Sequence, residues 1–137
     1  MAMQQDPAFV FLGTGPVVLV VDDDEDTRCV FVDVLEEAGY TAIAAANGRE
    51  ALRVLRGGVV PIAILLDLMM PVMDGWDFRA AQLRDPLLKD IPVVLVTSAG
   101  FSAKTFQDQL HGVELVRKPS KSDELLAAVA RAIVSLH

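Results

Sequence analysis

The sequence predicts a single α/β domain in which a parallel β-sheet carries helices on both faces. Short apolar runs of strand length alternate five times with segments whose apolar residues recur at helical spacing. Runs that are continuously apolar are typical of strands buried on both faces of a parallel sheet. The 137 residues, 53% of them hydrophobic, suit one domain with one substantial core. Right-handed crossovers then place the reactive edge at the carboxyl ends of the strands.

Five apolar runs predict the strands. The first run is aliphatic throughout, the second is a weaker signal, and the third ends directly before Asp67. We expect strands over residues 17–21, 41–46, 62–66, 92–96 and 113–116.

Five helices are expected between and after these strands. Apolar residues from Val30 onwards recur at helical spacing in the first helix, which ends at Gly39. Cys29 is expected to be a small core residue on this helix. Asn47 is a favourable N-cap for the second helix, which ends at Gly57.

The last three helices are defined less sharply. One is expected over about 76–84 and stops before Pro86, and a short one carries Ala103, Phe106 and Leu110. The last covers about 123–136 and has Ser120 or Ser122 as its cap. Its apolar face is expected to consist of Leu126, Val129, Ala130 and Ile133.

Charge and composition exclude several classes of function. The net charge of −7 and the scattered lysines and arginines argue against binding to nucleic acid, which needs a basic footprint. The longest apolar stretch, 59–66, is too short to cross a bilayer. No basic segment precedes the apolar patch 9–12, and the single cysteine suits a reducing compartment. We therefore expect a cytoplasmic protein that binds neither nucleic acid nor membrane.

The domain organisation is simple. Residues 1–15 are expected to form a poorly ordered N-terminal extension, and residues 16–137 to form the domain. Because the chain ends soon after the last predicted helix, no output domain is expected behind it.

An acidic cluster follows the first predicted strand. Asp22 and Asp23 come directly after that strand, and Asp67 follows the third. If those strands are neighbours, three carboxylates converge in one crevice, where their repulsion favours a bound cation. Mg²⁺ takes one or two carboxylates and keeps several waters, so it is the natural candidate. Residues 24–26 are better explained as acids at the start of the following helix.

Two other uses of an acidic turn do not fit this chain. An EF-hand needs glycine at the sixth loop position and glutamate at the twelfth, where this sequence has Thr27 and Asp33. A nucleotide site needs glycines and exposed backbone N–H groups after the first strand, but this turn is acidic and repels phosphates. Both alternatives are rejected.

Asp67 is a candidate nucleophile. A carboxylate can accept a phosphoryl group as an acyl phosphate, and the reaction depends mainly on positioning and charge neutralisation. Thr97 follows the fourth predicted strand and Lys118 follows the fifth, so both lie at the same edge as Asp67. Each signal is weak individually, but their combination in this order on an α/β sheet is specific.

Four stretches at the ends of predicted strands carry the candidate residues: Val20-Val21-Asp22-Asp23, Leu66-Asp67-Leu68-Met69-Met70-Pro71 with Asp74-Gly75, Val96-Thr97-Ser98, and Lys118-Pro119. Together they resemble the response-regulator receiver family. The resemblance implies a flavodoxin-like, doubly wound sheet of five parallel strands in the order 2-1-3-4-5, with five helices. It covers the chain from about Val17 to the C-terminus.

The resemblance also implies a phosphoacceptor and a metal site. Asp67 would accept a phosphoryl group from a sensor histidine kinase or a histidine phosphotransfer domain. Asp23, Asp67 and the backbone carbonyl of Met69 would bind Mg²⁺, with Asp22 as an outer carboxylate of the same metal site.

A switching mechanism follows from the same resemblance. Lys118 would pair with the phosphoryl oxygens or with Asp67, and its bond to Pro119 would be cis. Thr97 would donate its hydroxyl to the phosphoryl group and draw its loop inwards. That shift would switch a surface made by the fourth helix, the fifth strand and the fifth helix, where an output partner binds.

The sequence departs from the family at several positions. Leu115 stands where the family usually has an aromatic residue that reports phosphorylation, and Ser120 stands in place of phenylalanine. Met69 and Ala99 cannot orient an attacking water well, so slow loss of the phosphoryl group is expected. The output face is therefore expected to be unusual.

The expected function is a phosphorylation-switched signalling module that is no enzyme beyond its own Mg²⁺-dependent phosphorylation and slow dephosphorylation. The alternative is a receiver-like scaffold that binds partners without phosphate, for which Leu115 leaves room. A phosphatase with an aspartate nucleophile would need a second aspartate two residues after Asp67, where Met69 stands.

Overall fold

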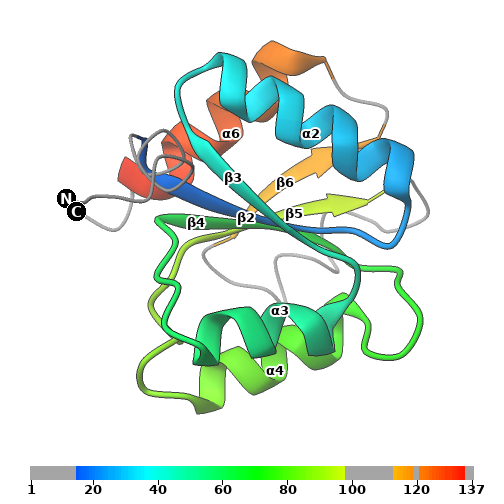
Figure 1. The fold of residues 1–137 in the computed structure, drawn as a ribbon, viewed down its shortest axis with the longest axis vertical. Coiled ribbons are helices and arrows are strands. Elements are labelled where there is room, and N and C mark those ends of the chain that lie inside the picture. Colours follow the sequence, from blue (N-terminus) through cyan, green and yellow to red (C-terminus); the bar gives the residue numbers. More distant parts are fainter. Residues whose placement is uncertain (1–14, 98–112, 119–120, 135–137) are drawn as a thin grey trace, which may run out of the picture.

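Five parallel strands form one sheet at the centre of the described part of the molecule (Figure 1). The computed structural model describes residues 15–97, 113–118 and 121–134. The strands are β2 (Val17–Val21), β3 (Thr41–Ala45), β4 (Ala63–Asp67), β5 (Val93–Thr97) and β6 (Glu114–Arg117). Their order in the sheet is β3-β2-β4-β5-β6, so the expected order 2-1-3-4-5 is confirmed.

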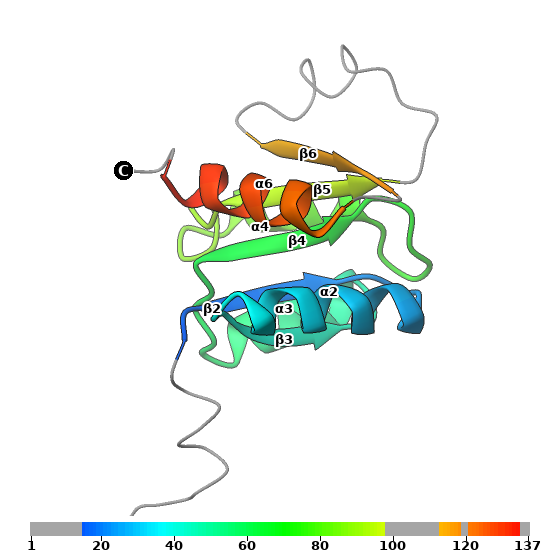
Figure 2. The ribbon, with the colours of Figure 1, turned by 90° about the horizontal axis from the view of Figure 1, so that it is seen from above.

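Two described helices cover each face of the sheet (Figures 1 and 2). They are α2 (Glu25–Glu37) and α6 (Ser122–Val134) on one face, and α3 (Gly48–Arg56) and α4 (Gly75–Arg84) on the other. The helix predicted around Ala103 lies outside the described residues, as does the segment 1–14. Within the described ranges, no helix has the length and apolar character needed to span a membrane.

Because both faces are covered, the central strands are buried on both sides. Every residue of β4 and β5 is buried, which explains why both strands are apolar up to their last residues, Asp67 and Thr97. Successive side chains of β4 enter different clusters. Ile64 and Leu66 pack in the cluster that contains Phe78 of α4, whereas Leu65 packs in the cluster that contains Leu35 of α2.

Two expectations about helix faces are wrong. Cys29 is exposed instead of being a core residue, and Val30 is 56% exposed. Ala130 is also exposed, although it was expected on the apolar face of the last helix. Periodicity identified only part of each buried face, because both helices carry apolar residues on most of their sides. Phe31, Leu35 and Val129 are buried as expected, and Leu126 and Ile133 are half-buried against the core. The buried residues of α6 are Leu125, Ala128, Val129 and Ala132.

The start of α4 presses against the end of β4. Asp74 caps the helix by accepting a hydrogen bond from the Asp77 N–H at 2.9 Å. Gly75 donates its N–H to the Leu68 carbonyl at 3.0 Å. A Cβ atom at Gly75 would lie 2.7 Å from the Asp67 carbonyl oxygen and 2.7 Å from the Leu68 Cα. Glycine is therefore required where this helix supports the backbone of Asp67.

Gly75→Ala is expected to destabilise the protein by about 1–3 kcal/mol, because the added methyl group must displace backbone atoms. Denaturant unfolding measures this change. Gly57→Ala is the control, and it is expected to cost less than Gly75→Ala. Its new Cβ would lie 3.2 Å from the nearest atom, the Arg53 carbonyl oxygen, so the backbone must move less than at Gly75. A free energy of unfolding for Gly75→Ala within about 0.5 kcal/mol of the wild type would contradict the close approach.

Candidate functional site

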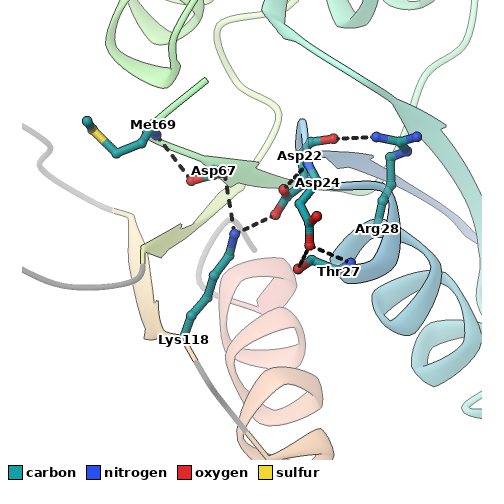
Figure 3. A network of polar contacts seen from close by, with 7 residues as sticks. All are labelled: Asp22, Asp24, Thr27, Arg28, Asp67, Met69 and Lys118. Atoms are coloured by element: carbon teal, nitrogen blue, oxygen red, sulfur yellow. Dashed lines mark hydrogen bonds and ion pairs between the residues drawn. The ribbon is translucent and has the colours of Figure 1, made fainter. Parts of the chain in front are cut away.

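The carboxyl ends of four strands bring the predicted site residues together, and Figure 3 shows Asp22, Asp67 and Lys118 among them. Asp67 and Thr97 are the last residues of β4 and β5. Each strand therefore ends one residue later than expected. Asp22 directly follows β2, and Lys118 directly follows β6. Because the strands pair in parallel, their carboxyl ends open on one edge of the sheet.

Three carboxylates meet between the ends of β2 and β4. One oxygen from each of Asp22, Asp23 and Asp67 lies within 4.8 Å of the others. Asp22 is 1% exposed and Asp67 is 5% exposed, whereas Asp23 is exposed to solvent. Charges at these separations repel strongly when they are buried. A donor set made only of oxygens and open on one side matches a hard divalent cation such as Mg²⁺.

Lys118 extends its ammonium group between the two buried carboxylates (Figure 3). Its Nζ donates to Asp22 Oδ2 at 2.7 Å and to Asp67 Oδ2 at 3.4 Å. The shorter contact is thus with Asp22, although the expected partner was Asp67 or a phosphoryl group. Burial acts to lower the pKa of Lys118, but the hydrogen bond to Asp22 and the charges of both carboxylates outweigh burial and raise it.

Asp67 is an unfavourable place for a negative charge. Burial raises the pKa of its carboxyl from 3.8 to about 6. The Met69 N–H, which donates to Asp67 Oδ1 at 3.1 Å, and the charge of Lys118 both oppose this rise. Repulsion from Asp22 adds to it. The charged form of Asp67 is therefore only partly compensated by the residues around it.

The hydroxyl group of Thr97 is buried at the end of β5. Thr97 is 1% exposed, and its Oγ1 has no hydrogen-bond partner among the described residues. A buried hydroxyl that lacks a partner costs about 1–3 kcal/mol. A ligand atom that accepts a hydrogen bond from Oγ1 would recover this free energy.

The turn from β2 into α2 is held by several polar contacts. Asp22 Oδ1 accepts from the Asp24 N–H at 2.9 Å. Asp24 caps α2, as expected for an acid at the helix start, and accepts from both the N–H and the hydroxyl of Thr27. The side-chain hydrogen bond from Thr27 lowers the pKa of Asp24, as does the backbone hydrogen bond. Arg28 donates from Nη1 to the Asp22 carbonyl at 2.8 Å.

Sequence reasoning missed this contact of Arg28. The available signal was that Arg28 is the only lysine or arginine between residues 22 and 37, a segment rich in acids.

The remaining candidate residues have different surroundings. The side chain of Met69 is 60% exposed beside Asp67, and Leu115 is half-buried against the core. Ala99 and Pro119 lie outside the described residues, so the cis bond before Pro119 stays a prediction.

The sequence matches one protein family over most of its length. Residues 18–130 match the response regulator receiver domain. The chain is 34% identical over 123 residues to the sensor histidine kinase CheAY of Helicobacter pylori, covering 85% of this chain and 15% of that protein. It is 33% identical over 114 residues to the phosphate regulon transcriptional regulatory protein PhoB of Pseudomonas aeruginosa, covering 82% of this chain and 49% of that protein. The chain thus spans less than half the length of these relatives.

Solved structures share the same fold. The signal receiver domain of a signal transduction histidine kinase from Syntrophus aciditrophicus matches with a TM-score of 0.78 and 30% identity, covering 88% of this chain and 92% of that chain. The chemotaxis protein CheY4 of Vibrio cholerae matches with a TM-score of 0.78 and 29% identity, covering 86% and 98%. Together with the sheet order and the acidic edge, these matches show that the chain belongs to the response regulator receiver domain family of two-component signalling.

Proposed function

We propose that this receiver domain accepts a phosphoryl group on Asp67 from a phosphohistidine donor, with Mg²⁺ bound beside it. The observation that carries the proposal is the convergence of three carboxylates with one ammonium group and one buried hydroxyl that has no partner in the described part of the chain. A nucleophile, a cation site and two hydrogen-bond donors are the groups that phosphoryl transfer to a carboxylate needs. They belong to Asp22, Asp23, Asp67, Lys118 and Thr97.

The donor set fits Mg²⁺, which prefers oxygen ligands and retains several waters. One oxygen from each of Asp22, Asp23 and Asp67 lies within 4.8 Å of the others. Following the family resemblance, Asp23, Asp67 and the Met69 carbonyl would hold the ion, and Asp22 would lie beside them as an outer carboxylate. When bound, the ion would neutralise charge on the carboxylates and on the phosphoryl oxygens. The exposure of Asp23 keeps the site accessible to solvent, which suits an ion that arrives hydrated.

The side chains of this chain carry out the transfer itself. A carboxylate oxygen of Asp67 attacks phosphorus, and the bond from phosphorus to the donor's histidine nitrogen breaks, leaving its electron pair on that nitrogen. Lys118 Nζ lies 3.4 Å from Asp67 Oδ2, so a small movement away from Asp22 brings it to the new phosphoryl oxygens. The hydroxyl of Thr97, which has no hydrogen-bond partner among the residues that the structure describes, then donates to the same group.

Phosphorylation is proposed to change the surface around β6 and α6. Lys118 directly follows β6, so a movement of its side chain acts on that end of the strand. Among the described residues, a hollow between β6 and α6 is lined by Leu115, Ala127 and Arg131. An output protein is proposed to bind this surface, with Leu115 replacing the family's aromatic residue.

The donor is proposed to be a sensor histidine kinase or a histidine phosphotransfer domain. One relative is named as a sensor histidine kinase and another as a transcriptional regulatory protein, which suits a role in two-component signalling. We further propose a cytoplasmic location, with residues 1–15 as an extension outside the domain, and no enzymatic activity beyond this self-directed chemistry.

A receiver-like scaffold that never takes phosphate is the second candidate, and Leu115 is the feature that favours it. Thr97 argues against this candidate, because a scaffold would gain nothing from a buried hydroxyl with no partner among the described residues.

Incubation with Mg²⁺ and acetyl phosphate is expected to add a single phosphoryl group to the wild type and none to Asp67→Asn. Intact-mass measurement detects the adduct, and a metal chelator is expected to abolish it. Asp74→Asn is the matched control, since Asp74 caps α4 outside the carboxylate cluster, and it is expected to retain the adduct. An adduct that persists on Asp67→Asn would show that another residue is the acceptor.

Asp67→Asn is also expected to raise the melting temperature of the metal-free protein by about 3 °C or more at about pH 8. The variant removes a charge that burial disfavours, and the pKa of Asp67 is raised to about 6 in the folded protein. The gain in stability of the variant over the wild type is therefore largest above about pH 6. It disappears as the pH falls towards about 4, because Asp67 of the wild type then becomes protonated and neutral. Melting curves with chelator at about pH 8 and pH 4.5 test this, and a pH-independent difference would contradict it.

The phosphorylated protein is expected to keep its phosphoryl group far longer than seconds, because Met69 cannot orient an attacking water. Met69→Gln, which is similar in length but carries an amide, is expected to shorten the lifetime by about threefold or more. Intact mass followed over time measures it. Val72→Asn adds an amide to another exposed position of the same loop, at a φ of 70° that asparagine tolerates, and serves as control. Wild-type loss within seconds would refute the expectation.

A further inference from the structure

Arg28 reaches back from α2 to the turn that carries two of the three clustered carboxylates (Figure 3). Its Nη1 donates to the backbone carbonyl of Asp22 at 2.8 Å. Its own N–H donates to the Asp24 carbonyl at 2.9 Å, so its backbone is anchored in the first turn of the helix. Arg28 is half-buried, and no other lysine or arginine occurs between residues 22 and 37. The guanidinium group of Arg28 therefore holds the carbonyl of the peptide bond between Asp22 and Asp23.

With this contact, each polar group of Asp22 has a partner. The Asp22 N–H donates to the Ala45 carbonyl at 3.1 Å. Its carboxylate accepts from the Asp24 N–H at 2.9 Å and from Lys118 Nζ at 2.7 Å. Its carbonyl lies where the chain leaves the sheet, and there Arg28 supplies the hydrogen bond. By binding this carbonyl, Arg28 fixes the orientation of the peptide group between Asp22 and Asp23, the one polar group of Asp22 that the other three contacts do not hold.

We propose that Arg28 is a positioning residue for the metal site, which it serves by fixing the Asp22–Asp23 peptide and so directing the Asp23 carboxylate towards Asp67. This inference rests on the proposed binding of Mg²⁺. Asp23 is the exposed member of the cluster, so it depends more on its backbone for placement than its buried neighbours do. Residues that orient metal ligands typically contribute on the order of 10–100-fold to metal affinity.

A simple charge effect predicts the opposite result. A guanidinium group near a cation site repels the incoming ion, so removing it would strengthen Mg²⁺ binding if charge were its only influence. Loss of positioning would weaken binding instead. The sign of the change in affinity therefore separates the two accounts.

Mg²⁺ affinity of the full chain is measured by competition against Mn²⁺, with electron paramagnetic resonance detecting the unbound Mn²⁺. Arg28→Gln is expected to weaken Mg²⁺ binding on the order of 10-fold. Arg28→Lys, which keeps a donor and the charge, is expected to stay within about threefold of the wild type. Arg49→Gln is the charge control, because Arg49 is an exposed arginine in the first turn of α3, and its affinity is expected to be unchanged or slightly higher.

Melting curves without metal check that each variant is folded, and Arg28→Met repeats the neutral substitution if the glutamine variant is not. Mg²⁺ affinity equal to or tighter than wild type in the neutral variant would overturn the positioning role. Failure of the wild type itself to bind either ion would instead overturn the proposed function, and this inference with it.

Discussion

The site depends on the placement of two buried carboxylates, Asp22 and Asp67, on either side of the single ammonium group of Lys118. The parallel sheet imposes this arrangement, because neighbouring strands β2 and β4 end at the same edge and both of their faces are covered by helices. Lys118 lies 2.7 Å from one carboxylate and 3.4 Å from the other, so its one charge is shared unequally between two. Burial keeps the uncompensated charge costly, as the raised pKa of Asp67 shows.

Long-range coupling in the fold follows from the same contacts. Asp22 and Lys118 are 96 positions apart in the sequence, and their hydrogen bond ties the end of edge strand β6 to the end of β2, with β4 and β5 between them in the sheet. In the proposed function, new negative charge at Asp67 competes with Asp22 for this ammonium group. Under that proposal, two arrangements of Lys118 would correspond to two states of β6, and a change at one carboxylate would thereby reach the proposed protein-binding surface.

The sequence predicted most of the site because each of its residues stands at or beside the end of an apolar run. Asp22, Asp67, Thr97 and Lys118 needed only the strand assignments and the parallel arrangement to be placed at one edge, and the strand order itself came from the family resemblance. The buried faces of α2 and α6 were only partly predictable from periodicity, because both helices carry apolar residues on most of their sides. Phe31, Leu35 and Val129 were placed correctly, whereas Cys29 and Ala130 were not.

Contacts between distant backbones were also beyond the sequence. The hydrogen bond from Arg28 to the Asp22 carbonyl depends on how the turn folds back on its helix. The need for glycine at position 75 depends on the approach of α4 to β4. Lys118 Nζ lies 2.7 Å from Asp22 and 3.4 Å from Asp67. No residue pattern encodes so small a difference between two carboxylates.

The most direct test of the central claim is a crystal structure of the chain with Mg²⁺ and beryllium fluoride, which mimics a phosphoryl group on a carboxylate. The account predicts beryllium bonded to an oxygen of Asp67 and its fluorides accepting hydrogen bonds from the Thr97 hydroxyl and the Lys118 ammonium. It also predicts Mg²⁺ held by Asp23, Asp67 and the Met69 carbonyl. Beryllium bonded to a different residue, or Lys118 still paired with Asp22 while the Thr97 hydroxyl contacts no fluoride, would contradict it.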